Sequence, residues 1–345
     1  MIFFSDQGDR NMLKKGPLIL AGDIGGTKTN LAVFADGNPR MPLCEASFAS
    51  SAYADLETMV DEFLTSCGLT VQRAAFGVAG PIIEGWAKVT KLSWLIKPEA
   101  IKKAFALSEV LVVNDLVATA HGIAALADAD LICLNPGRAV KHGPLAVIAP
   151  GTGLGEALMF WDGSRYRTQP TEGGHALFSP ATRQQLALAE FLFERSGAVS
   201  FDLMASGRGL PLIYEFLKQT GSYVEPASLA QALTMASDPA SVISKAALDA
   251  EKAEPLCLAA LQLFVEIIAV EAANLALKSL STGGLFIGGG IPPRILPIFR
   301  GGFVPTFIGH GVMREVLNAM PIHLITNPKT ALFGAARLAM TSVED

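Results

Sequence analysis

The sequence predicts an α/β protein of two related domains, and three observations lead to this fold class. The chain has 345 residues, which is enough for two domains that each bury a core. Half of the residues are apolar and 17% are charged, a composition typical of packed globular proteins rather than disordered ones. A strand–bend–strand pattern occurs twice, at residues 17–37 and 144–163, and strand-like and helix-like runs follow each copy.

The two copies of this pattern share more than their hydrophobicity. "PLILAGDIGGTKTNLAVFADG" can be laid over "PLAVIAPGTGLGEALMFWDG" with one residue of slippage. Each copy reads as proline, apolar strand, Gly/Thr-rich bend, second apolar strand and then Asp-Gly. Chance similarity between two common hairpins is one explanation. The shared bend favours an internal duplication instead, in which each domain contributes one bend to a common cleft.

The first bend, "GDIGGTKT", nearly matches the Walker A pattern of nucleotide-binding P-loops. Gly22, Lys28 and Thr29 fit the pattern, but Thr27 stands where the second glycine belongs. A P-loop is followed by a helix whose N-terminus binds phosphate, whereas residues 29–37 read as a strand that ends in an Asp-Gly turn. We therefore expect a β-hairpin, in which Thr27 donates a hydroxyl hydrogen bond to phosphate and Lys28 is not diagnostic.

The residues of this bend suit a phosphate that is bound together with a cation. Asp23 ends the first strand, where α/β sheets place ligands, and its carboxylate would repel phosphate unless a cation intervened. Mg²⁺ held mainly through water meets that need, so Asp23 is the expected metal ligand. Gly25 and Gly26 let backbone N–H groups approach phosphate closely. The structural alternative is an ordinary tight hairpin with an aspartate in its turn.

The remaining elements follow in chain order. In the first half we expect strands at residues 42–48, 74–78 and 110–114, and helices at 54–67 and after Asp115. In the second half we expect helices at 184–196, 209–219 and 258–280, and a short strand at 284–290. Residues 258–280 are long and apolar enough to suggest a membrane span, but Glu266, Glu271 and Lys278 interrupt them. This segment is therefore predicted to be a buried helix with one polar stripe.

"LVVNDL" places Asn114 and Asp115 at the end of an apolar strand and just before a helix. Such a pair is common at helix N-caps, which is the structural interpretation. The functional interpretation is that Asp115 accepts a proton from an attacking hydroxyl. A carboxylate with an ordinary pKa of about 3.9 is a weak base, but the loose transition state of phosphoryl transfer needs little early proton removal.

Two motifs of the second half suit phosphate and sugar. "PGTGLG" is the second Gly/Thr bend, and Gly151 and Thr152 are its candidate phosphate contacts. "TEGGH" places Glu172 and His175 around two glycines. A carboxylate and an imidazole there would hydrogen-bond neighbouring sugar hydroxyls. A polar turn with a surface histidine is the alternative, and a zinc site is less supported because the motif holds one histidine and one glutamate.

"GGLFIGGGIPPR" reads as a strand followed by a loop that approaches something bulky. An adenine or a ribose against Gly288, Gly289 and Gly290 fits that description. A plain junction of strand and turn is the alternative.

The charge and cysteine patterns exclude several classes of function. The formal net charge is −5 and no run of Lys and Arg occurs, so nucleic acid is not an expected partner. The N-terminal "MIFF" is too short and too soon followed by charges for a signal peptide, and no membrane partner is expected. The four cysteines are scattered without C-x-x-C spacing. We therefore expect neither a zinc site nor a disulfide framework, but reduced thiols in the cytoplasm.

Taken as a set, "DIGGT", "VND", "PGTGLG", "EGGH" and "GGLFIGGGIPPR" resemble the motifs of bacterial glucokinases in order and spacing. These enzymes are the hexokinase-like sugar kinases of the actin/hsp70/hexokinase superfamily, and the resemblance covers residues 17–340. It implies ATP- and Mg²⁺-dependent phosphorylation of the 6-hydroxyl of glucose. It also implies two ribonuclease-H-like (actin-like ATPase) domains around a central cleft, with bounds at 1–125 plus 327–345 and at 126–326. The C-terminal helix, in residues 326–339, would return to complete the smaller first domain.

The same resemblance assigns roles by motif. Asp115 is the expected catalytic base, and the expected sugar ligands are Asn114, Asp115, Glu172, His175 and Asp202. Asp202 stands in "GAVSFDLMASGRGL" where the family has a glutamate one methylene longer, so its contact with the sugar is the least certain. The expected ATP contacts are Asp23, Gly25, Gly26, Thr27, Gly151 and Thr152 for the phosphates, and Gly288, Gly289 and Gly290 for the adenosine.

The motifs leave several functions open. Lys28 after "DIGGT" is frequent in the ROK sugar kinases and repressors. No run of cysteines follows His175, however, and only 16 residues precede the first strand, too few for a repressor's helix-turn-helix domain. A kinase for a related hexose or N-acetylhexosamine, a phosphoryl donor other than ATP and a non-catalytic sugar-binding regulator also stay open. The resemblance also suggests a homodimer, and residues 1–16 look like an addition for which Met12 would be an alternative start.

Overall fold

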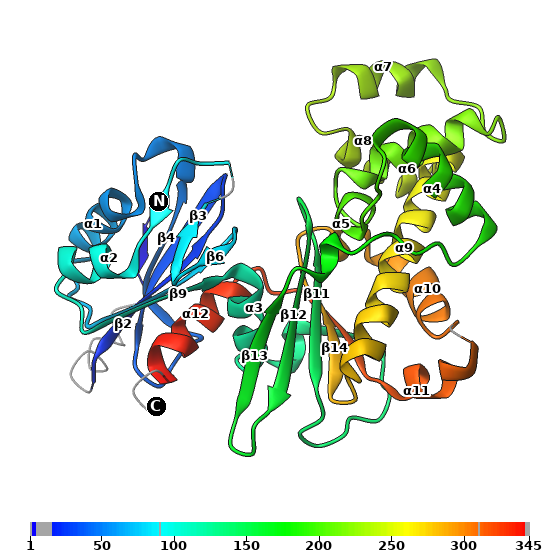
Figure 1. The fold of residues 1–345 in the computed structure, drawn as a ribbon. Helices are drawn as coiled ribbons and strands as arrows, with labels where there is room; N and C mark the ends of the chain where they lie inside the picture. Colours follow the sequence, from blue (N-terminus) through cyan, green and yellow to red (C-terminus); the bar gives the residue numbers. More distant parts are fainter. Residues whose placement is uncertain (1, 5–15, 90, 310, 342–345) are drawn as a thin grey trace. The chain divides into compact units, whose positions relative to one another are not determined.

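The computed structural model describes residues 2–4, 16–89, 91–309 and 311–341, and Figure 1 shows its ribbon. Contacts divide the chain into two compact units. Unit 1 comprises Met1–Asp130 and Asn327–Asp345, and unit 2 comprises Leu131–Thr326. The chain therefore leaves unit 1 after Asp130 and re-enters it at Asn327. Met12, the alternative start, lies outside the described residues.

The sheet of unit 1 has the strand order β1-β4-β3-β2-β5-β9. The strands β2, β3 and β4 form an antiparallel meander, whereas β2, β5 and β9 run parallel to one another. Their bounds are Ile2–Phe4 (β1), Leu18–Ile24 (β2), Lys28–Ala35 (β3), Pro42–Ala49 (β4), Arg73–Val78 (β5) and Glu109–Asn114 (β9). A separate small sheet holds Ile82–Ile83 (β6), Trp86–Lys88 (β7) and Leu95–Ile96 (β8). Part of the segment that the sequence sets apart as an addition thus forms β1, on the edge of the main sheet.

Helices cover both faces of this sheet. Its helices are Leu56–Cys67 (α1), Pro98–Ala104 (α2), Asp115–Ile123 (α3) and Thr330–Thr341 (α12). One face packs against α1, which begins at its N-cap Asp55 and ends at Gly68 in the left-handed conformation (φ 63°). The other face packs against α12, the red helix of Figure 1, which comes from the far end of the chain. Because α12 also packs against α3, it supports the helix that begins with Asp115.

The sheet of unit 2 has the strand order β10-β15-β14-β11-β12-β13. Its strands are Leu131–Asn135 (β10), Leu145–Pro150 (β11), Leu154–Trp161 (β12), Tyr166–Thr171 (β13), Gly284–Ile287 (β14) and Ile322–Ile325 (β15). Its helices are Arg183–Ser196 (α4), Phe201–Met204 (α5), Gly209–Gln219 (α6), Ala227–Met235 (α7), Pro239–Ala247 (α8), Pro255–Ser279 (α9), Leu296–Phe307 (α10) and Arg314–Ala319 (α11). Here too the first and second strands of the repeat, β11 and β12, form a hairpin.

The predicted buried helix is confirmed as α9, the yellow helix of Figure 1. Among the described residues it is the helix long and apolar enough to cross a membrane, but 78% of its most apolar window is buried inside the fold. Its buried residues belong to the large core cluster of unit 2. The expected polar stripe is present, since Gln262 and Lys278 are exposed and Glu266 and Asn274 are half-buried.

Five strands follow the same order in both units. Unit 1 has β4-β3-β2-β5-β9 and unit 2 has β13-β12-β11-β14-β15, with the first three antiparallel and the last three parallel in each. The hairpin of unit 1 closes at the pair Ile24–Thr29, and that of unit 2 closes at Pro150–Leu154. The second bend is thus one residue shorter. The repeat in the sequence therefore corresponds to a repeat in topology. The one-residue offset between the two copies lies in the bend.

One prediction about the cysteines is wrong. Cys44 of β4 and Cys67 at the end of α1 form a disulfide, whereas Cys133 and Cys257 are free. The two cysteines are 23 residues apart in the sequence, and α1 folds back onto the sheet face to which Cys44 points. Scattered spacing in the sequence did not reveal this pairing, because the packing of helix on sheet creates it.

Candidate active site

The first Gly/Thr bend is the turn of the β2–β3 hairpin, which confirms the hairpin prediction over a Walker loop. The N–H of Gly25 donates to the carbonyl of Lys28 at 3.0 Å, which closes the bend. Ser50 braces it from outside: its N–H donates to the Thr27 carbonyl at 3.0 Å and its hydroxyl donates to the Gly25 carbonyl at 2.7 Å. Ser50 was missed in the sequence because it follows β4, more than 20 residues after the bend.

Lys28 points toward other elements of unit 1. It lines a cavity of about 310 Å³ together with residues of β3, β4 and the start of α12, among them Asn30, Glu45 and Lys329. Lys329 is held there by both carboxylate oxygens of Glu45, each at 2.7 Å. Lys28 thus lies on a hairpin and lines a cavity of unit 1, a context that differs from that of a P-loop lysine.

Asp23 lies in β2 beside the first bend. Its register partner on β3 is Asn30, whose amide donates to Asp23 Oδ2 at 3.2 Å. Burial raises the pKa of the Asp23 carboxyl above its usual value, and the hydrogen bond from Asn30 and the charge of Lys28 partly oppose that shift. An additional positive charge beside Asp23 would favour the ionised form.

Asp23 and Asp115 belong to the same edge of the sheet. The register places Asp23 level with Gly77 of β5, and Gly77 level with Val113 of β9. Asn114 and Asp115 follow directly. A Cβ added to Gly77 would lie 2.7 Å from the Cβ of Ala118 in α3, so only glycine allows α3 to start this close to the sheet. The carboxyl ends of three parallel strands thus bring two carboxylates and the first bend to one edge.

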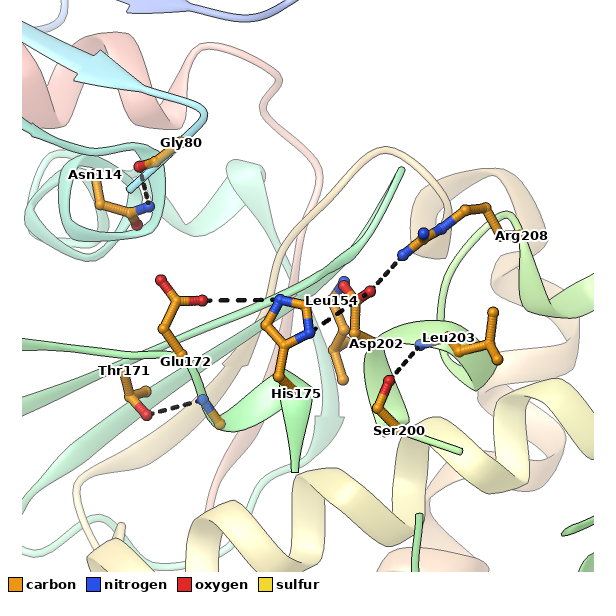
Figure 2. A network of polar contacts seen from close by, with 11 residues as sticks. Gly80, Asn114, Leu154, Thr171, Glu172, His175, Ser200, Asp202, Leu203 and Arg208 are labelled. Carbon is orange, nitrogen blue, oxygen red and sulfur yellow. Dashed lines mark hydrogen bonds and ion pairs between the residues drawn. The ribbon is translucent and has the colours of Figure 1, made fainter. Parts of the chain in front are cut away.

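Asn114 is a helix cap, as the structural interpretation expected. Its side-chain oxygen accepts from the N–H of Leu116 at 2.8 Å, and its amide donates to the carbonyl of Gly80 at 3.4 Å (Figure 2). Asp115 is the first residue of α3, and its Oδ1 also accepts from the Leu116 N–H, at 3.0 Å. Both side chains are half-buried. A capping role and a catalytic role can coexist at Asp115, because a carboxylate can accept several hydrogen bonds.

In unit 2, three glycine-containing segments converge at the ends of β11 and β14. The N–H of Gly151 donates to the Gly153 carbonyl at 2.8 Å, and the N–H of Gly207 donates to the Gly151 carbonyl at 2.9 Å. The N–H of Gly288 continues the ladder to Ile148 at 2.8 Å. Gly289 has a φ of 84°, and a Cβ there would overlap the carbonyl of Pro150. The second bend and the 288–290 loop therefore lie side by side, and Gly290 faces open space.

The predicted sugar ligands of unit 2 form one cluster (Figure 2). The His175 ring lies between two carboxylates: its Nε2 is 4.0 Å from Glu172 Oε2 and its Nδ1 is 4.0 Å from Asp202 Oδ2. The side chains of Glu172 and His175 are 76% and 64% exposed, which leaves them free to reach a ligand. Asp202 is buried, so the three residues differ in their freedom to move.

Asp202 connects the sugar cluster to the second bend. Its Oδ1 accepts from the N–H of Leu154 at 2.8 Å, and its Oδ2 forms an ion pair with Arg208. A Cβ on Gly153 would lie 2.5 Å from Asp202 Oδ1, so glycine is required there. Arg208 was missed in the sequence, and no local signal singles it out, because the pairing depends on the turn between α5 and α6.

Two buried carboxyls lie beneath this cluster, and the sequence analysis did not pair them. Glu156 of β12 is 3% exposed and Glu271 of α9 is 1% exposed. Burial and the neighbouring Glu271 raise the pKa of Glu156 to about 8. Burial also raises the pKa of Glu271, which the hydrogen bond from Asn274 and the charge of Lys278 oppose. A single glutamate at the start of the otherwise apolar run "EALMFW" is the signal that could have pointed to this pair.

The donor set at Asp23 fits Mg²⁺, which can be held largely through water. It has too few protein ligands for a metal ion that is coordinated by side chains alone. Among the described residues, no group of three or more His, Cys, Asp or Glu could hold a metal ion. One carboxylate with an amide beside it is the kind of donor set that Mg²⁺ accepts, since this ion keeps several waters and shares its ligands with substrate phosphates.

Comparison with known proteins identifies the family. A family model described as Glucokinase matches residues 20–342. The chain belongs to the glucokinase family. The glucokinase of Nostoc punctiforme is 36% identical to it over 338 residues, covering 93% of this chain and 98% of the relative. The family resemblance drawn from the motifs is therefore confirmed.

Solved structures of glucokinases share the fold. A glucokinase from an Antarctic psychrotroph matches with a TM-score of 0.82 and 28% identity, covering 95% of this chain and 100% of that one. A ROK family glucokinase from Streptomyces griseus, in complex with glucose and AMPPNP, matches with a TM-score of 0.64 and 20% identity, covering 94% of this chain and 100% of that one. Together with the strand order, these matches confirm the predicted ribonuclease-H-like fold of both halves.

Proposed function

We propose that this protein is a glucokinase that transfers the γ-phosphoryl group of ATP to the 6-hydroxyl of glucose, with Mg²⁺ as cofactor. The observation that carries the proposal is the placement of Asp115. It begins α3 at the same sheet edge as the first Gly/Thr bend, where a carboxylate can meet a hydroxyl next to a phosphate-binding turn. The glucose and AMPPNP bound in the Streptomyces griseus structure support the choice of substrates by analogy of fold.

In unit 1 the residues supply a base and a phosphate turn. Asp115 accepts the proton of the 6-hydroxyl as the oxygen attacks phosphorus, and the N–H of Leu116 holds its carboxylate in place. Gly25, Gly26 and Thr27 hold the phosphates with backbone and hydroxyl donors. Asp23 would hold Mg²⁺ through water. When bound, Mg²⁺ neutralises charge on the phosphate oxygens.

In unit 2 the residues supply sugar ligands and a nucleotide surface. Glu172 and His175 accept and donate hydrogen bonds to sugar hydroxyls. Asp202 is held by Leu154 and Arg208, so it can offer a hydroxyl only its remaining lone pairs. Gly151 and Thr152 contact the phosphates, and Gly288, Gly289 and Gly290 contact the adenosine.

The larger-scale expectations belong to the same proposal. The two units act as separate domains with bounds near residues 125 and 327. The protein works in the cytoplasm, does not bind nucleic acid or membrane, and forms a homodimer as the resemblance suggests.

The test is a coupled assay of ADP release over a panel of glucose, mannose, fructose and N-acetylglucosamine, with and without Mg²⁺. We expect release that requires Mg²⁺ and is fastest with glucose. A faster reaction with another sugar would correct the substrate. Sugar binding by calorimetry without any ADP release would favour the non-catalytic regulator, and replacement of ATP by other donors tests the phosphoryl source.

A further inference from the structure

We propose that Glu156 is a positioning residue for sugar binding: it shares one proton with Glu271 and, in that state, supports the turn that carries Glu172 and His175. The inference rests on the proposed function, because it assumes that this turn binds the sugar. It adds a residue that touches neither the sugar nor ATP, and it predicts how sugar affinity depends on pH.

The first step is the contact between Glu156 and the turn. Glu156 pairs in register with Thr171, the last residue of β13, and the turn begins with the next residue. The N–H of Gly173 donates to Thr171 Oγ1 at 3.0 Å. A Cβ added to Gly173 would overlap Glu156 Oε2, and one added to Gly174 would overlap the carbonyl of Leu154. The two glycines of "EGGH" therefore let the turn lie directly on β12, with the Glu156 carboxyl beneath it.

The second step is the state of the carboxyl pair. Glu156 and Glu271 are both almost completely buried, so the repulsion between two negative charges at this place would not be screened by solvent. Asn274 donates to Glu271 Oε2 at 3.1 Å, which favours the ionised form of Glu271. Glu156 then carries the proton and donates it to Glu271. The raised pKa of Glu156, about 8, agrees with this assignment.

The third step concerns the charges that face Glu156. From α9 these are Glu271 and Lys278, and Lys278 is exposed and only partly offsets the negative charge. The other elements that contact β12 also carry charged groups: the turn carries the exposed Glu172 and His175, and α5 carries Asp202, which is bound to Arg208. Glu156 Oε1 has no hydrogen-bond partner among the described residues. An ionised Glu156 would therefore receive no hydrogen bond at Oε1 from the described residues.

The consequence is a pH-dependent turn. Below pH 8 the pair holds one proton and the two carboxyls stay together under Gly173. Above pH 8 the proton is lost to solvent and the two carboxylates repel each other. Glu156 then moves directly beneath Gly173, where the turn lies against it without a side chain between them, and so displaces the turn. We expect the KM for glucose to rise while kcat changes little, since Asp115 and the first bend lie in unit 1.

The experiment compares wild type with Glu156→Gln, which keeps a donor to Glu271 but cannot ionise. If only the protonated pair binds sugar, the wild-type KM for glucose rises about tenfold from pH 7 to pH 9 for a pKa of about 8. Glu156→Gln should stay flat over this range. Glu190→Gln, which removes an exposed carboxyl of α4, is the matched control and should behave as wild type. A KM that rises equally in Glu156→Gln, or one that is flat in wild type, would overturn the proposal.

A second variant and a second readout keep the test independent of folding and of turnover. Glu271→Gln leaves one carboxyl that can ionise without a charged neighbour, so the rise in KM should shrink; an unchanged rise would count against the pair. Glucose binding by calorimetry at pH 7 and pH 9 should follow the same pattern as KM. Absence of ADP release at every pH would refute the kinase function alone, because the calorimetric comparison still tests the turn.

Discussion

The hairpins of the two units have the same topology but place their carboxyl groups at different depths. Beside the bend of unit 1, Asp23 pairs with Asn30, and the next pair inward is Gly22 with Leu31. Beside the bend of unit 2, Ala149 pairs with Gly155, and the next pair inward is Ile148 with Glu156. Leu31 is fully buried in an apolar cluster, whereas Glu156 is buried next to another carboxyl.

This difference suggests that the two halves of a duplicated fold have divided the work. Unit 1 leaves Asp23 and Asp115 half-buried at the sheet edge, where they can meet cations, protons and phosphates. Unit 2 places Ala149 and Gly155 at the equivalent edge and buries its carboxyls, of which Asp202 accepts from the N–H of Leu154.

The largest expected effect comes from the edge of unit 1. Asp115→Asn keeps a side-chain acceptor for the Leu116 N–H but removes the base. We expect kcat to fall by about 10²–10⁴, the usual contribution of general base catalysis, with glucose affinity within a few-fold of wild type. Coupled ADP release and calorimetry measure the two quantities. Asp128→Asn, at an exposed position of unit 1, is the control, and near-normal turnover of Asp115→Asn would contradict the assignment.

The second effect concerns the other carboxylate of that edge. Asp23→Asn should raise the Mg²⁺ concentration needed for half-maximal activity by about 10- to 100-fold, the range for residues that hold a metal through an intermediate group. Activity should partly return at high Mg²⁺. The exposed Asp61→Asn serves as control in a magnesium titration of ADP release. If Asp23→Asn needs no more Mg²⁺ than wild type for half-maximal activity, Asp23 is not a ligand of the cation, and the contrast between the units is weaker.

A smaller effect is expected on the stability of unit 1. Gly334 of α12 lies against α3, where a Cβ would overlap the carbonyl of Ala118. Gly334→Ala should lower the free energy of unfolding by about 1–3 kcal/mol, as overpacking usually does. Gly301→Ala is the matched control, since a Cβ on that helical glycine of α10 meets nothing within 4 Å. Urea unfolding measures the free energy of unfolding of both variants. Equal values would mean that α3 and α12 can move apart to accommodate the added methyl group without loss of stability.

The smallest effect is a pH dependence of stability that belongs to unit 2. The pKa of Glu156 is raised from 4.5 to about 8 on folding, so its contribution is fully present below pH 4.5 and is lost as the pH rises through 8. Between pH 7 and pH 8 this loss amounts to about 1 kcal/mol. Urea unfolding should show a decrease in wild type over that interval that Glu156→Gln lacks. The same slope in both proteins would assign the proton to another group.

Local signals in the sequence were enough for much of the fold. The hairpin at "DIGGT" followed from a strand where a P-loop has a helix, and α6 was predicted with the bounds Gly209–Gln219 that the structure shows. The end of α1 at Cys67 followed from Gly68, whereas the helix starts at Leu56, two residues after the predicted start. The repeat predicted two related halves, and their common strand order bears this out.

What the sequence could not give depends on contacts between distant elements. Ser50 braces the first bend from the end of β4, Gly80 accepts a hydrogen bond from Asn114, and Arg208 pairs with Asp202. Cys44 and Cys67 meet only because α1 packs on the sheet. Glu156 and Glu271 are 115 residues apart, and each alone reads as one charge in an apolar segment. The candidate site residues could be predicted from local motifs, whereas the residues that hold them in place could be identified only in the tertiary structure.

The position of α12 has a consequence for biosynthesis. Unit 1 begins to emerge first from the ribosome, but one face of its sheet is covered by residues that are translated after all of unit 2. Unit 2 is therefore able to complete its core first, while the α3 face of unit 1 stays uncovered until α12 has been translated. A chain that terminates early would keep every catalytic motif and still lack the helix that supports Asp115. Unit 1 is thus completed only after the whole of unit 2 has been translated.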